Sequence, residues 1–308
     1  MKVRLVYNPS AGMKTAREQL ARAVDELREG EWSVDVVETT RLGEAEHLAR
    51  QAAGLALDAV VAVGGDGTMN EVANGVVGTT TALGVLPLGT ANVWAKEMGL
   101  PLGDLSAGAR LLTQAQVCPV DVGQIQGPSV APRIFVLWCG IGLDAAITRY
   151  IEPQREMKRR LGALLFWLVG IREAWGFRGR PVILEMGDVR TRKRVILALA
   201  ANAQLYGGIV RIAPQAKIDD GLLDLVVFKG TGFGMTALHL VRVFLGLHLR
   251  NPQVEAYHLA CVGIRGKNLP VQVDGEPVGW TPVDIAVRPR ALRILVPKTA
   301  NHTLFAGS

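Results

Sequence analysis

Short strand-like runs and helix-like segments alternate through the first third of the chain, and this alternation most constrains its fold. Each run rich in β-branched residues is followed by a segment whose apolar residues recur at helical spacing. Since two strands joined by a helix normally lie parallel, the order predicts a doubly wound parallel α/β sheet with helices on both faces. The predicted strands are residues 3–7, 33–38, 57–63 and 83–87, and the predicted helices are residues 16–28, 43–53, 68–76 and 92–98.

The remainder of the chain has mainly the pattern of strands. No low-complexity linker or internal repeat marks the change near residue 122. We therefore expect an α/β domain of residues 1–122, rejoined by the C-terminal segment 291–308, and a β-rich, sandwich-like domain of residues 123–290. The second domain has predicted strands at residues 134–138, 182–185, 195–201, 223–228 and 271–273, and predicted helices at residues 155–175 and 234–249.

Composition and charge narrow the range of partners. The chain has 308 residues, of which 49% are hydrophobic, so that it can bury a sizeable core. A formal net charge of +6 and a pI near 9.4 favour an anionic partner such as ATP, an acidic lipid surface or a nucleic acid. Because the basic residues are dispersed and no nucleic-acid-binding motif accompanies them, no nucleic-acid partner is expected.

No segment has the pattern of a targeting or membrane-spanning sequence. The opening residues resemble a strand and lack the apolar run of a signal peptide, which predicts a cytoplasmic protein. The longest apolar stretch, residues 161–171, is shorter than the roughly 20 residues that span a bilayer. Cys118, Cys139 and Cys261 are too few and too widely spaced for a disulfide framework or a metal cluster, and we expect ordinary thiols in or near the core.

The segment Gly64-Gly65-Asp66-Gly67 joins a buried strand to a helix. Glycine lets the backbone approach a ligand and a helix start favours anions, so the turn is either a phosphate site or a tight structural turn. A carboxylate repels phosphate unless it binds ribose hydroxyls or recruits Mg²⁺, so Asp66 favours a nucleotide. Thr68 and Glu71 have the spacing of a capping box. The turn matches neither the P-loop nor the dinucleotide fingerprint.

Three further segments are candidate binding or turn elements. Residues 87–92 form a second strand-to-helix junction, and two adjacent junctions would hold a ligand in the crevice between them. Asp274-Gly275, between two strand-like runs, predicts a hairpin turn. Residues 217–224 are acidic and turn-like, which suits either a hard cation or an exposed turn.

Together these segments resemble the diacylglycerol kinase catalytic family, particularly its bacterial lipid-kinase branch, to which the sphingosine kinases are related. The resemblance runs through nearly the whole chain, and a set of ordered motifs is far more specific than any one of them. The motifs are Asn8-Pro9-Ser10-Ala11-Gly12, residues 64–71, residues 87–92, Gly140-Ile141-Gly142-Leu143-Asp144-Ala145, residues 213–224 and Val273-Asp274-Gly275-Glu276-Pro277.

The resemblance implies an ATP-dependent lipid kinase that transfers the γ-phosphoryl group to a hydroxyl of diacylglycerol or a similar lipid, with ATP and Mg²⁺ as cofactors. It implies a nucleotide-binding first domain, a lipid-substrate second domain and an active site in the cleft between them. The nucleotide-binding residues implied by the resemblance are Asn8, Pro9, Ser10, Ala11, Gly12, Thr40, Gly64, Gly65, Asp66, Gly67, Thr68, Met69, Asn70, Glu71 and Thr90.

Catalytic and metal-binding roles follow from the same resemblance. Glu276 is expected to be the general base for the lipid hydroxyl, Asp274 to help organise the metal, and Asp66 to lie near the catalytic metal. The family's structural Mg²⁺ site maps to the backbone oxygens of Lys217 and Leu222 and to the carboxylate of Asp220.

One position departs from the family pattern. Where the family commonly has an acidic residue after Asn92, this chain has Val93. A metal or water contact is thereby lost. Asp121 is either a compensating acid of the same network or a simple strand-end aspartate.

A basic and aromatic stretch predicts peripheral contact with an anionic membrane surface, although a helix packed on the second domain with a solvated basic end explains it equally. A homodimer stays open. The residues of the stretch are Lys158, Arg159, Arg160, Phe166, Trp167, Trp175, Phe177, Arg178 and Arg180.

Two other function classes fit the same residues. An NAD kinase-like small-molecule kinase resembles this chain around the Gly-Gly-Asp-Gly turn, but residues 87–92 favour the lipid branch. A non-catalytic lipid-binding or regulatory relative is suggested by Val93, whereas retention of Asp66, Asp274 and Glu276 argues against it. The sequence does not identify the acceptor lipid.

Overall fold

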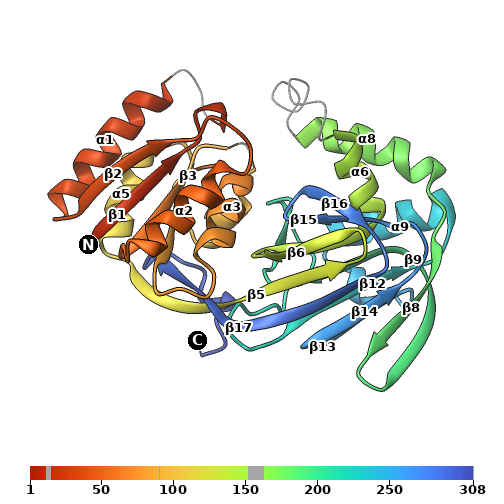
Figure 1. Ribbon diagram of the computed structural model, residues 1–308. Coiled ribbons are helices and arrows are strands. Elements are labelled where there is room, and N and C mark those ends of the chain that lie inside the picture. The colour runs from red at the N-terminus through yellow and green to blue at the C-terminus, as the bar shows by residue number, and fades with distance from the viewer. Residues whose placement is uncertain (12–14, 90, 152–162, 308) are drawn as a thin grey trace. The chain divides into compact units, whose positions relative to one another are not determined.

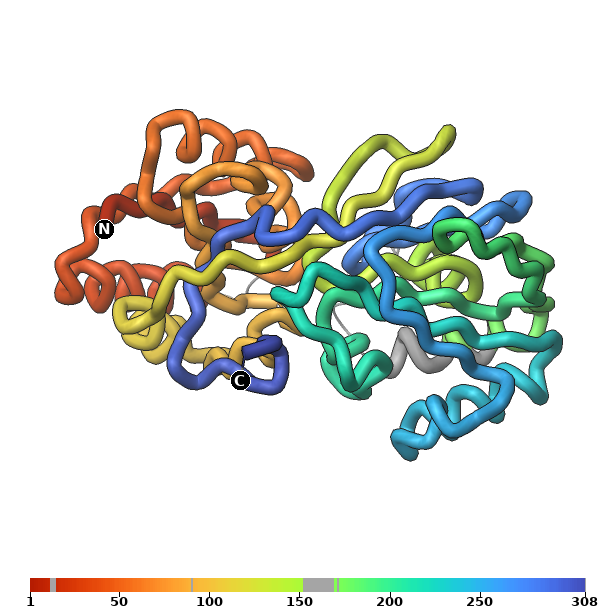
Figure 2. The backbone as a smooth tube through the Cα atoms, turned by 90° about the horizontal axis from the view of Figure 1, so that it is seen from below, coloured from red at the N-terminus to blue at the C-terminus, as the bar shows by residue number. Residues whose placement is uncertain are grey.

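The computed structural model describes residues 1–11, 15–89, 91–151 and 163–307 (Figure 1). The chain divides into unit 1, residues 1–122, 218–220 and 289–308, and unit 2, residues 123–217 and 221–288. It passes from one unit to the other within strands β5 (Gln116–Gly127) and β17 (Val283–Val296) and around residues 217–221. β5 and β17 pair with each other and run side by side in Figure 2.

The sheet of unit 1 is parallel. Its strands are β1 (Lys2–Tyr7), β2 (Ser33–Glu38), β3 (Ala59–Gly64) and β4 (Ala82–Pro87), in the order β2-β1-β3-β4. Ile294 of β17 also pairs in parallel with Leu83 of β4. β3 and β4 are buried along their whole length, as strands covered on both faces must be. The predicted parallel α/β architecture is thus confirmed.

Helices cover both faces of this sheet (Figure 1). α1 (Ala16–Glu29) and α5 (Leu105–Thr113) pack together on one face, where Leu27 and Leu112 share a core with Leu5 and Val61. α2 (Glu44–Gly54) and α3 (Asp66–Val76) pack together on the other face. The sequence periodicity did not predict α5. The other elements of unit 1 are α4 (Val93–Glu97) and the 3-10 turns η1 (Pro9–Ala11) and η3 (His302–Leu304).

Unit 2 consists mainly of antiparallel strands, which confirms the expected β-rich domain. They pair in the order β16-β15-β7-β9-β8-β14-β17, β12 pairs with β9 and β13, and β5 pairs with β6. Phe135, Leu184, Leu225 and Ile264 belong to its buried core. The elements are β6 (Val130–Phe135), β7 (Trp138–Gly142), α6 (Leu143–Ile151), α8 (Ala163–Gly176), β8 (Arg180–Met186), β9 (Val189–Ala201), β10 (Leu205–Tyr206), β11 (Val210–Arg211), β12 (Leu223–Lys229), α9 (Gly232–Phe244), η2 (His248–Arg250), β13 (Val254–Leu259), β14 (Cys261–Arg265), β15 (Pro270–Val273) and β16 (Glu276–Trp280).

Two elements predicted for this unit are interrupted. The strand predicted at residues 134–138 is the end of β6 and the start of β7, because the backbone N–H groups between them bind the carboxylate of Asp274. The helix predicted at residues 234–249 ends at Phe244, since Gly246 takes a left-handed conformation (φ 65°) that terminates helices. Of the helix predicted at residues 155–175, residues 155–162 lie outside the described part of the chain.

No helix in the described part of the chain is long and apolar enough to cross a membrane. Of the three cysteines, Cys139 is buried, Cys118 is half-buried and Cys261 is exposed. The expected core setting is therefore wrong for Cys261. This residue begins β14 on the face of the strand opposite to that of its buried neighbour Val262.

The contact of α2 with α3 depends on Gly75. A Cβ atom on Gly75 would lie 2.5 Å from the carbonyl oxygen of Glu46 and 2.7 Å from the Cβ of Ala49. We therefore expect Gly75→Ala to lower the free energy of unfolding by about 1–3 kcal/mol through overpacking. Chemical denaturation measures this change.

Gly54 provides the matched control for this prediction. It ends α2, and a Cβ atom there would meet nothing within 4 Å. Gly54→Ala should leave the stability unchanged or raise it by up to about 1 kcal/mol. Equal effects of the two substitutions would contradict the close packing of α2 on α3.

Candidate active site

Asn8 joins the turn after β1 to the start of α3. Its backbone N–H donates to the carbonyl of Val63 at 3.0 Å, and its side-chain amide donates to the Oγ1 of Thr68 at 3.0 Å. The amide oxygen of Asn8 accepts the N–H of Ser10 at 3.0 Å, which holds the turn Pro9–Ala11 in place. Gly12, the last residue of this predicted motif, lies outside the described residues.

The glycine turn lets two strand-to-helix junctions approach each other through their backbones. α3 begins at Asp66, directly after Gly65. A Cβ atom on Gly89 would lie 2.7 Å from the Cα of Gly65, and the N–H of Leu88 donates to the carbonyl of Gly64 at 2.8 Å. The first N–H groups of α3, including that of Gly67, start at this point, and such groups favour anions.

Asp66 connects the two junctions. Its carboxylate accepts the backbone N–H of Trp94 at 3.2 Å, at the start of α4. Burial raises the pKa of Asp66, and the backbone N–H groups of Val93 and Trp94 and the charge of Lys96 act in the opposite direction. Val93, at the position where an acidic residue is missing, is itself buried. Asp66 therefore has a structural role, the binding of backbone N–H groups, which is separate from any role toward a metal.

Glu71 performs a different task from the predicted capping box. Its two carboxylate oxygens accept the backbone N–H groups of Gly43 and Ala45, at 3.0 and 3.1 Å, and so hold the start of α2. Thr68 lies within α3 and pairs with Asn8. The capping-box interpretation is wrong because α3 begins at Asp66, which puts Thr68 inside the helix.

The other predicted nucleotide-binding residues differ in accessibility. Met69 and Asn70 are buried in α3. Thr40 is exposed after β2 and donates both its N–H and its hydroxyl to the carboxylate of Glu44, at 2.5 and 2.9 Å. Thr90 lies outside the described residues.

In unit 2, Asp274 occupies the hairpin turn between β15 and β16. Asp274 and Gly275 both have positive φ, 46° and 86°, which confirms the predicted hairpin. The buried carboxylate of Asp274 accepts the backbone N–H groups of Val136, Leu137 and Trp138 at 2.9, 3.0 and 2.9 Å. The turn is thereby fixed to the chain between β6 and β7.

Glu276 follows on the same hairpin, and its carboxylate is partly exposed. Its Oε2 lies 3.1 Å from the Nη2 of Arg133 on β6, so the guanidinium orients the carboxylate. The sequence analysis missed Arg133. Its only signal is a charged residue between the apolar residues of a strand.

A network of buried hydrogen bonds holds the β15–β16 hairpin in place. Asp144, the second residue of α6, accepts the hydroxyl of Tyr206 and, at 2.5 Å, the side-chain amide of Gln272. The amide oxygen of Gln272 accepts the N–H of Gly275 at 2.8 Å. Burial raises the pKa of Asp144, and the two side-chain hydrogen bonds lower it. Asp144 stood in a recognised motif, but nothing in the sequence connects it with Gln272 or Tyr206.

The acidic loop at residues 217–222 is anchored through Ile218 and Asp219. Asp219 accepts the N–H of Ala306 at 2.7 Å, and Ile218 accepts the N–H of Asp121 at 2.6 Å. Asp121 in turn accepts the N–H of Arg290 at 2.7 Å, which gives it a structural role, and its compensating role toward a metal stays a prediction.

The predicted structural Mg²⁺ ligands are two backbone carbonyl oxygens and one carboxylate. Within the described ranges no group of three His, Cys, Asp or Glu side chains could hold a metal. A site of backbone carbonyls with one carboxylate is of a different kind, and its hard oxygen donors suit Mg²⁺. Lys217, Asp220 and Leu222 therefore stay predicted ligands.

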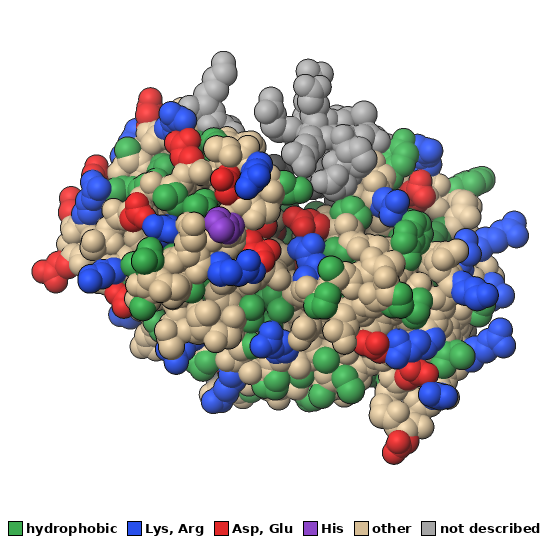
Figure 3. Space-filling model, viewed as in Figure 1, with side chains coloured by type: hydrophobic (Ala, Val, Ile, Leu, Met, Phe, Trp, Pro, Cys, Tyr) green, Lys and Arg blue, Asp and Glu red, His purple; other side chains and the backbone are tan. Residues whose placement is uncertain are grey.

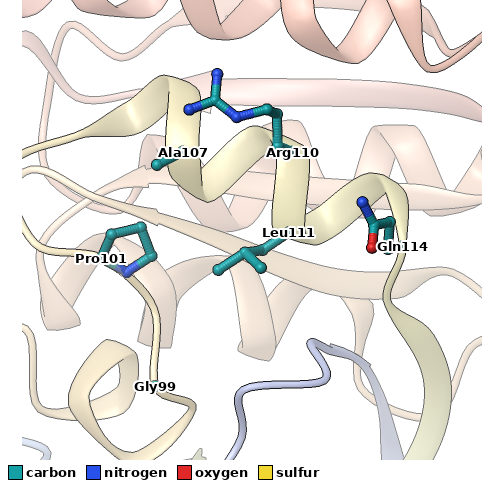
Figure 4. A pocket seen from close by; sticks show the side chains of 6 residues that line it. All are labelled: Gly99, Pro101, Ala107, Arg110, Leu111 and Gln114. Atoms are coloured by element: carbon teal, nitrogen blue, oxygen red, sulfur yellow. The ribbon is translucent and has the colours of Figure 1, made fainter.

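In the described part of the chain, each unit has a cavity. One, of about 470 Å³, is lined by Gly99, Pro101 and residues of α5 such as Arg110, and contains none of the predicted site residues (Figure 4). The other, of about 460 Å³, lies in unit 2 between α6, α8 and the β15–β16 hairpin. Its lining is mixed: Phe177, Pro270 and Trp280 lie beside the charged side chains of Arg149, Glu173 and Arg180.

The position of Asp274 leads to a stability prediction. Asn also tolerates positive φ, so Asp274→Asn keeps the turn but removes the charge and one acceptor oxygen. We expect a loss of about 2–3 kcal/mol in the free energy of unfolding. Asp188→Asn, in the exposed turn after β8, should change it by less than about 0.5 kcal/mol. Equal denaturation midpoints for the two variants would show that the hydrogen bonds to Asp274 do not stabilise unit 2.

Known proteins are similar to this chain over nearly its full length. Residues 2–125 match the diacylglycerol kinase catalytic domain, and residues 138–296 match the YegS C-terminal NAD kinase beta sandwich-like domain. The diacylglycerol kinase of Bacillus subtilis (strain 168) is 27% identical over 300 residues, which cover 96% of this chain and 97% of that protein. A "Probable lipid kinase YegS-like" of Chromohalobacter salexigens is 30% identical over 285 residues, with 91% and 89% covered.

The solved structures agree with this placement. A crystal structure of a proposed diacylglycerol kinase from Bacillus anthracis str. Sterne superposes with a TM-score of 0.83 at 26% identity, and covers 97% of this chain and 96% of its own. Both domains thus match in order, and relatives of one kind extend over nearly the full length. The chain belongs to the diacylglycerol kinase family, in its bacterial lipid-kinase branch.

Proposed function

We propose that the protein is an ATP-dependent lipid kinase, with unit 1 as the nucleotide-binding domain and unit 2 as the lipid-substrate domain. The observation that carries the proposal is the arrangement at the ends of β1, β3 and β4. There Asn8 binds Thr68 of α3, Asp66 binds the backbone of Trp94, and Gly65 and Gly89 bring the two junctions together. The curated relatives named as diacylglycerol and lipid kinases support the same activity.

In this proposal the glycine turn receives the phosphates of ATP. The N–H groups at the start of α3 offer donors to anionic oxygens, and the absence of a Cβ at Gly65 and Gly89 lets the two junctions pack backbone against backbone. Asp66 would hold Mg²⁺ directly or through water, and its half-buried carboxylate is the hard donor that this ion prefers. Bound Mg²⁺ neutralises charge on the phosphates.

Unit 2 would present the general base. Glu276 would accept the proton of the lipid hydroxyl while Arg133 keeps its carboxylate oriented. Asp274 fixes the hairpin through backbone N–H groups, and we propose that it also helps to organise the metal. The cavity lined by Phe177, Pro270 and Trp280, and also by Arg149 and Arg180, abuts this hairpin, and this mixed lining suits an amphipathic acceptor with an apolar part and a polar head.

Because its acceptor would reside in a bilayer, the protein should act as a cytoplasmic enzyme in peripheral contact with an anionic membrane. The basic residues first suggested for that contact, Lys158, Arg159 and Arg160, lie outside the described residues. The decisive assay is incubation with Mg²⁺ and labelled ATP against a panel of lipids in mixed micelles, diacylglycerol included. Labelled lipid is the expected product.

The alternatives correspond to separate outcomes of that assay. The family of the second domain bears NAD kinase in its name, so NAD is included as a soluble acceptor. Labelled NADP without labelled lipid would assign the NAD kinase-like function. ATP and lipid binding without any labelled product would assign the non-catalytic role.

The general base yields the first functional prediction. Glu276→Gln should lower turnover by a factor of about 10² to 10⁴ while ATP affinity stays nearly unchanged, since only proton acceptance is lost. Initial rates and nucleotide binding measure the two effects.

Glu185→Gln is the matched control for this substitution. Glu185 is likewise a partly exposed glutamate of unit 2 paired with arginines, Arg190 and Arg265. Its replacement should leave turnover near that of the wild type. Full activity of Glu276→Gln would remove Glu276 from the role of base.

The structural metal yields the second functional prediction. If Lys217, Asp220 and Leu222 bind Mg²⁺ in the folded state alone, added Mg²⁺ raises the melting temperature by mass action. Asp220→Ala should abolish that rise. Asp219→Ala removes the hydrogen bond to Ala306 and should lower the melting temperature but preserve the response to Mg²⁺. An identical Mg²⁺ response in wild type and Asp220→Ala would rule out the site.

A further inference from the structure

Unit 2 carries an exposed apolar surface that the proposed chemistry does not use. Trp175, near the end of α8, is 74% exposed, and its ring lies against that of Phe233 at the start of α9, with centroids 4.9 Å apart. Leu238, Val241 and Leu245 follow at helical spacing and are exposed by 42%, 54% and 64%. We call these five residues the α9 surface.

α9 buries polar residues and exposes apolar ones, which is the reverse of an ordinary surface helix. Thr236 and His239 are buried, and the Nε2 of His239 lies 2.8 Å from the carbonyl oxygen of Lys229. The other ring nitrogen of His239 contacts the side chain of Asn251 at 3.4 Å. A helix on a globular core normally buries its apolar stripe. These contacts instead fix α9 with that stripe facing outward.

The segment that contains α9 has no acidic residue. Between Leu225 and Val254 the chain has Lys229, Arg242 and Arg250 but neither Asp nor Glu. Lys229 is paired with Glu255 at 2.6 Å, so Arg242 and Arg250 carry the positive charge of this segment. An apolar helix face with basic residues and no acidic ones has the chemistry of a helix that lies in the interface of an anionic bilayer. The Trp–Phe pair adds rings of the type that prefer the headgroup region.

Further basic residues adjoin the start of α9. The N–H of Gly230 donates to the carbonyl of Arg194 at 3.0 Å, and the guanidinium of Arg194 donates to the carbonyl of Gly179 at 2.9 Å. Arg178 and Arg194 are exposed there. Lys and Arg side chains predominate along the outer edge of unit 2 (Figure 3), and the chain around α9 projects at an edge of that unit (Figure 2).

We propose that the α9 surface docks unit 2 onto an anionic lipid bilayer, a contact that rests on the proposed lipid-kinase function and gives it a membrane-binding site. A second copy of the chain is a poorer occupant. A twofold interface must complement itself, and the carboxylate next to this segment, Glu255, is already paired with Lys229 and Lys193, so that Arg242 and Arg250 would meet like charge. Anionic headgroups supply the missing negative charge, and the acyl boundary takes up the apolar side chains.

Vesicle binding without ATP tests this surface. Vesicles of phosphatidylcholine with phosphatidylglycerol should bind the wild-type protein more tightly than phosphatidylcholine alone, and less tightly as salt rises. Val241→Gln with Leu245→Gln should weaken partitioning by about tenfold or more, because two buried apolar side chains are lost. The control pairs Val117→Gln with Leu55→Gln, a valine and a leucine of unit 1 exposed by 47% and 65%. The control variant should bind as the wild type does.

Each outcome decides a separate question. Unchanged binding by the α9 variant, with a normal melting curve, overturns the docking surface. A wild-type dimer that the α9 variant dissociates, with vesicle binding intact, assigns the surface to a second copy and also overturns the proposal. Since binding is measured without turnover, a protein that binds vesicles through α9 but phosphorylates no lipid would disprove the kinase function and leave the docking surface standing.

Bromolipid quenching gives a second measurement that does not depend on loss of affinity. Trp175 should be quenched by brominated acyl chains in anionic vesicles, and Trp175→Phe should remove that component of the quenching. If the quenching is the same in both proteins, Trp175 does not enter the bilayer and the proposed orientation is wrong.

Discussion

Carboxylates that bind backbone N–H groups organise both units of this protein. Asp274 receives three such groups between β6 and β7, Glu71 receives two at the start of α2, and Asp66 receives that of Trp94. Such charge-assisted bonds are about twice as strong as neutral ones and fix the geometry of turns. The strand break before Trp138 and the junction between α3 and α4 both follow from them.

The bonds between carboxylates and backbone N–H groups also fix the turns of the candidate site. Phosphoryl transfer needs accurate positioning more than covalent chemistry, so fixed turns are a large part of what the protein must supply. On the β15–β16 hairpin, Asp274 and Gln272 bind backbone groups, whereas Glu276 is held by the side chain of Arg133. The guanidinium of Arg133 orients the carboxylate of Glu276 and leaves it partly exposed, whereas the carboxylate of Asp274 is buried among backbone N–H groups.

The sequence was sufficient for the architecture because hydrophobic periodicity reports burial directly. The alternation in unit 1 and the strand-rich pattern in unit 2 both reproduce the fold class, and Asp274-Gly275 identified its turn from positive-φ chemistry. Interruptions were harder to foresee. The gap between β6 and β7 depends on Asp274, which lies more than a hundred residues away along the chain, and no local pattern contains such a contact.

The site residues show the same limit at the level of side chains. An acidic residue in a turn has one appearance in the sequence, whether it binds a metal or a backbone N–H group. Asp219 and Asp220 are adjacent, and it is the carboxylate of Asp219 that accepts the N–H of Ala306. Arg133, Gln272 and Tyr206 were missed since each acts on a partner that is distant in sequence.

Val93 affects the ionisation of its neighbour Asp66. Its side chain is buried, and its backbone N–H lies at the carboxylate of Asp66, whose pKa is already raised by burial. A second carboxylate at position 93 would add like-charge repulsion and raise that pKa further. With valine there, Asp66 keeps two backbone donors and the charge of Lys96 as its neighbours, all of which favour its ionised form. Valine at position 93 therefore supplies no ligand of its own and leaves the carboxylate of Asp66 easier to ionise than an acid at that position would.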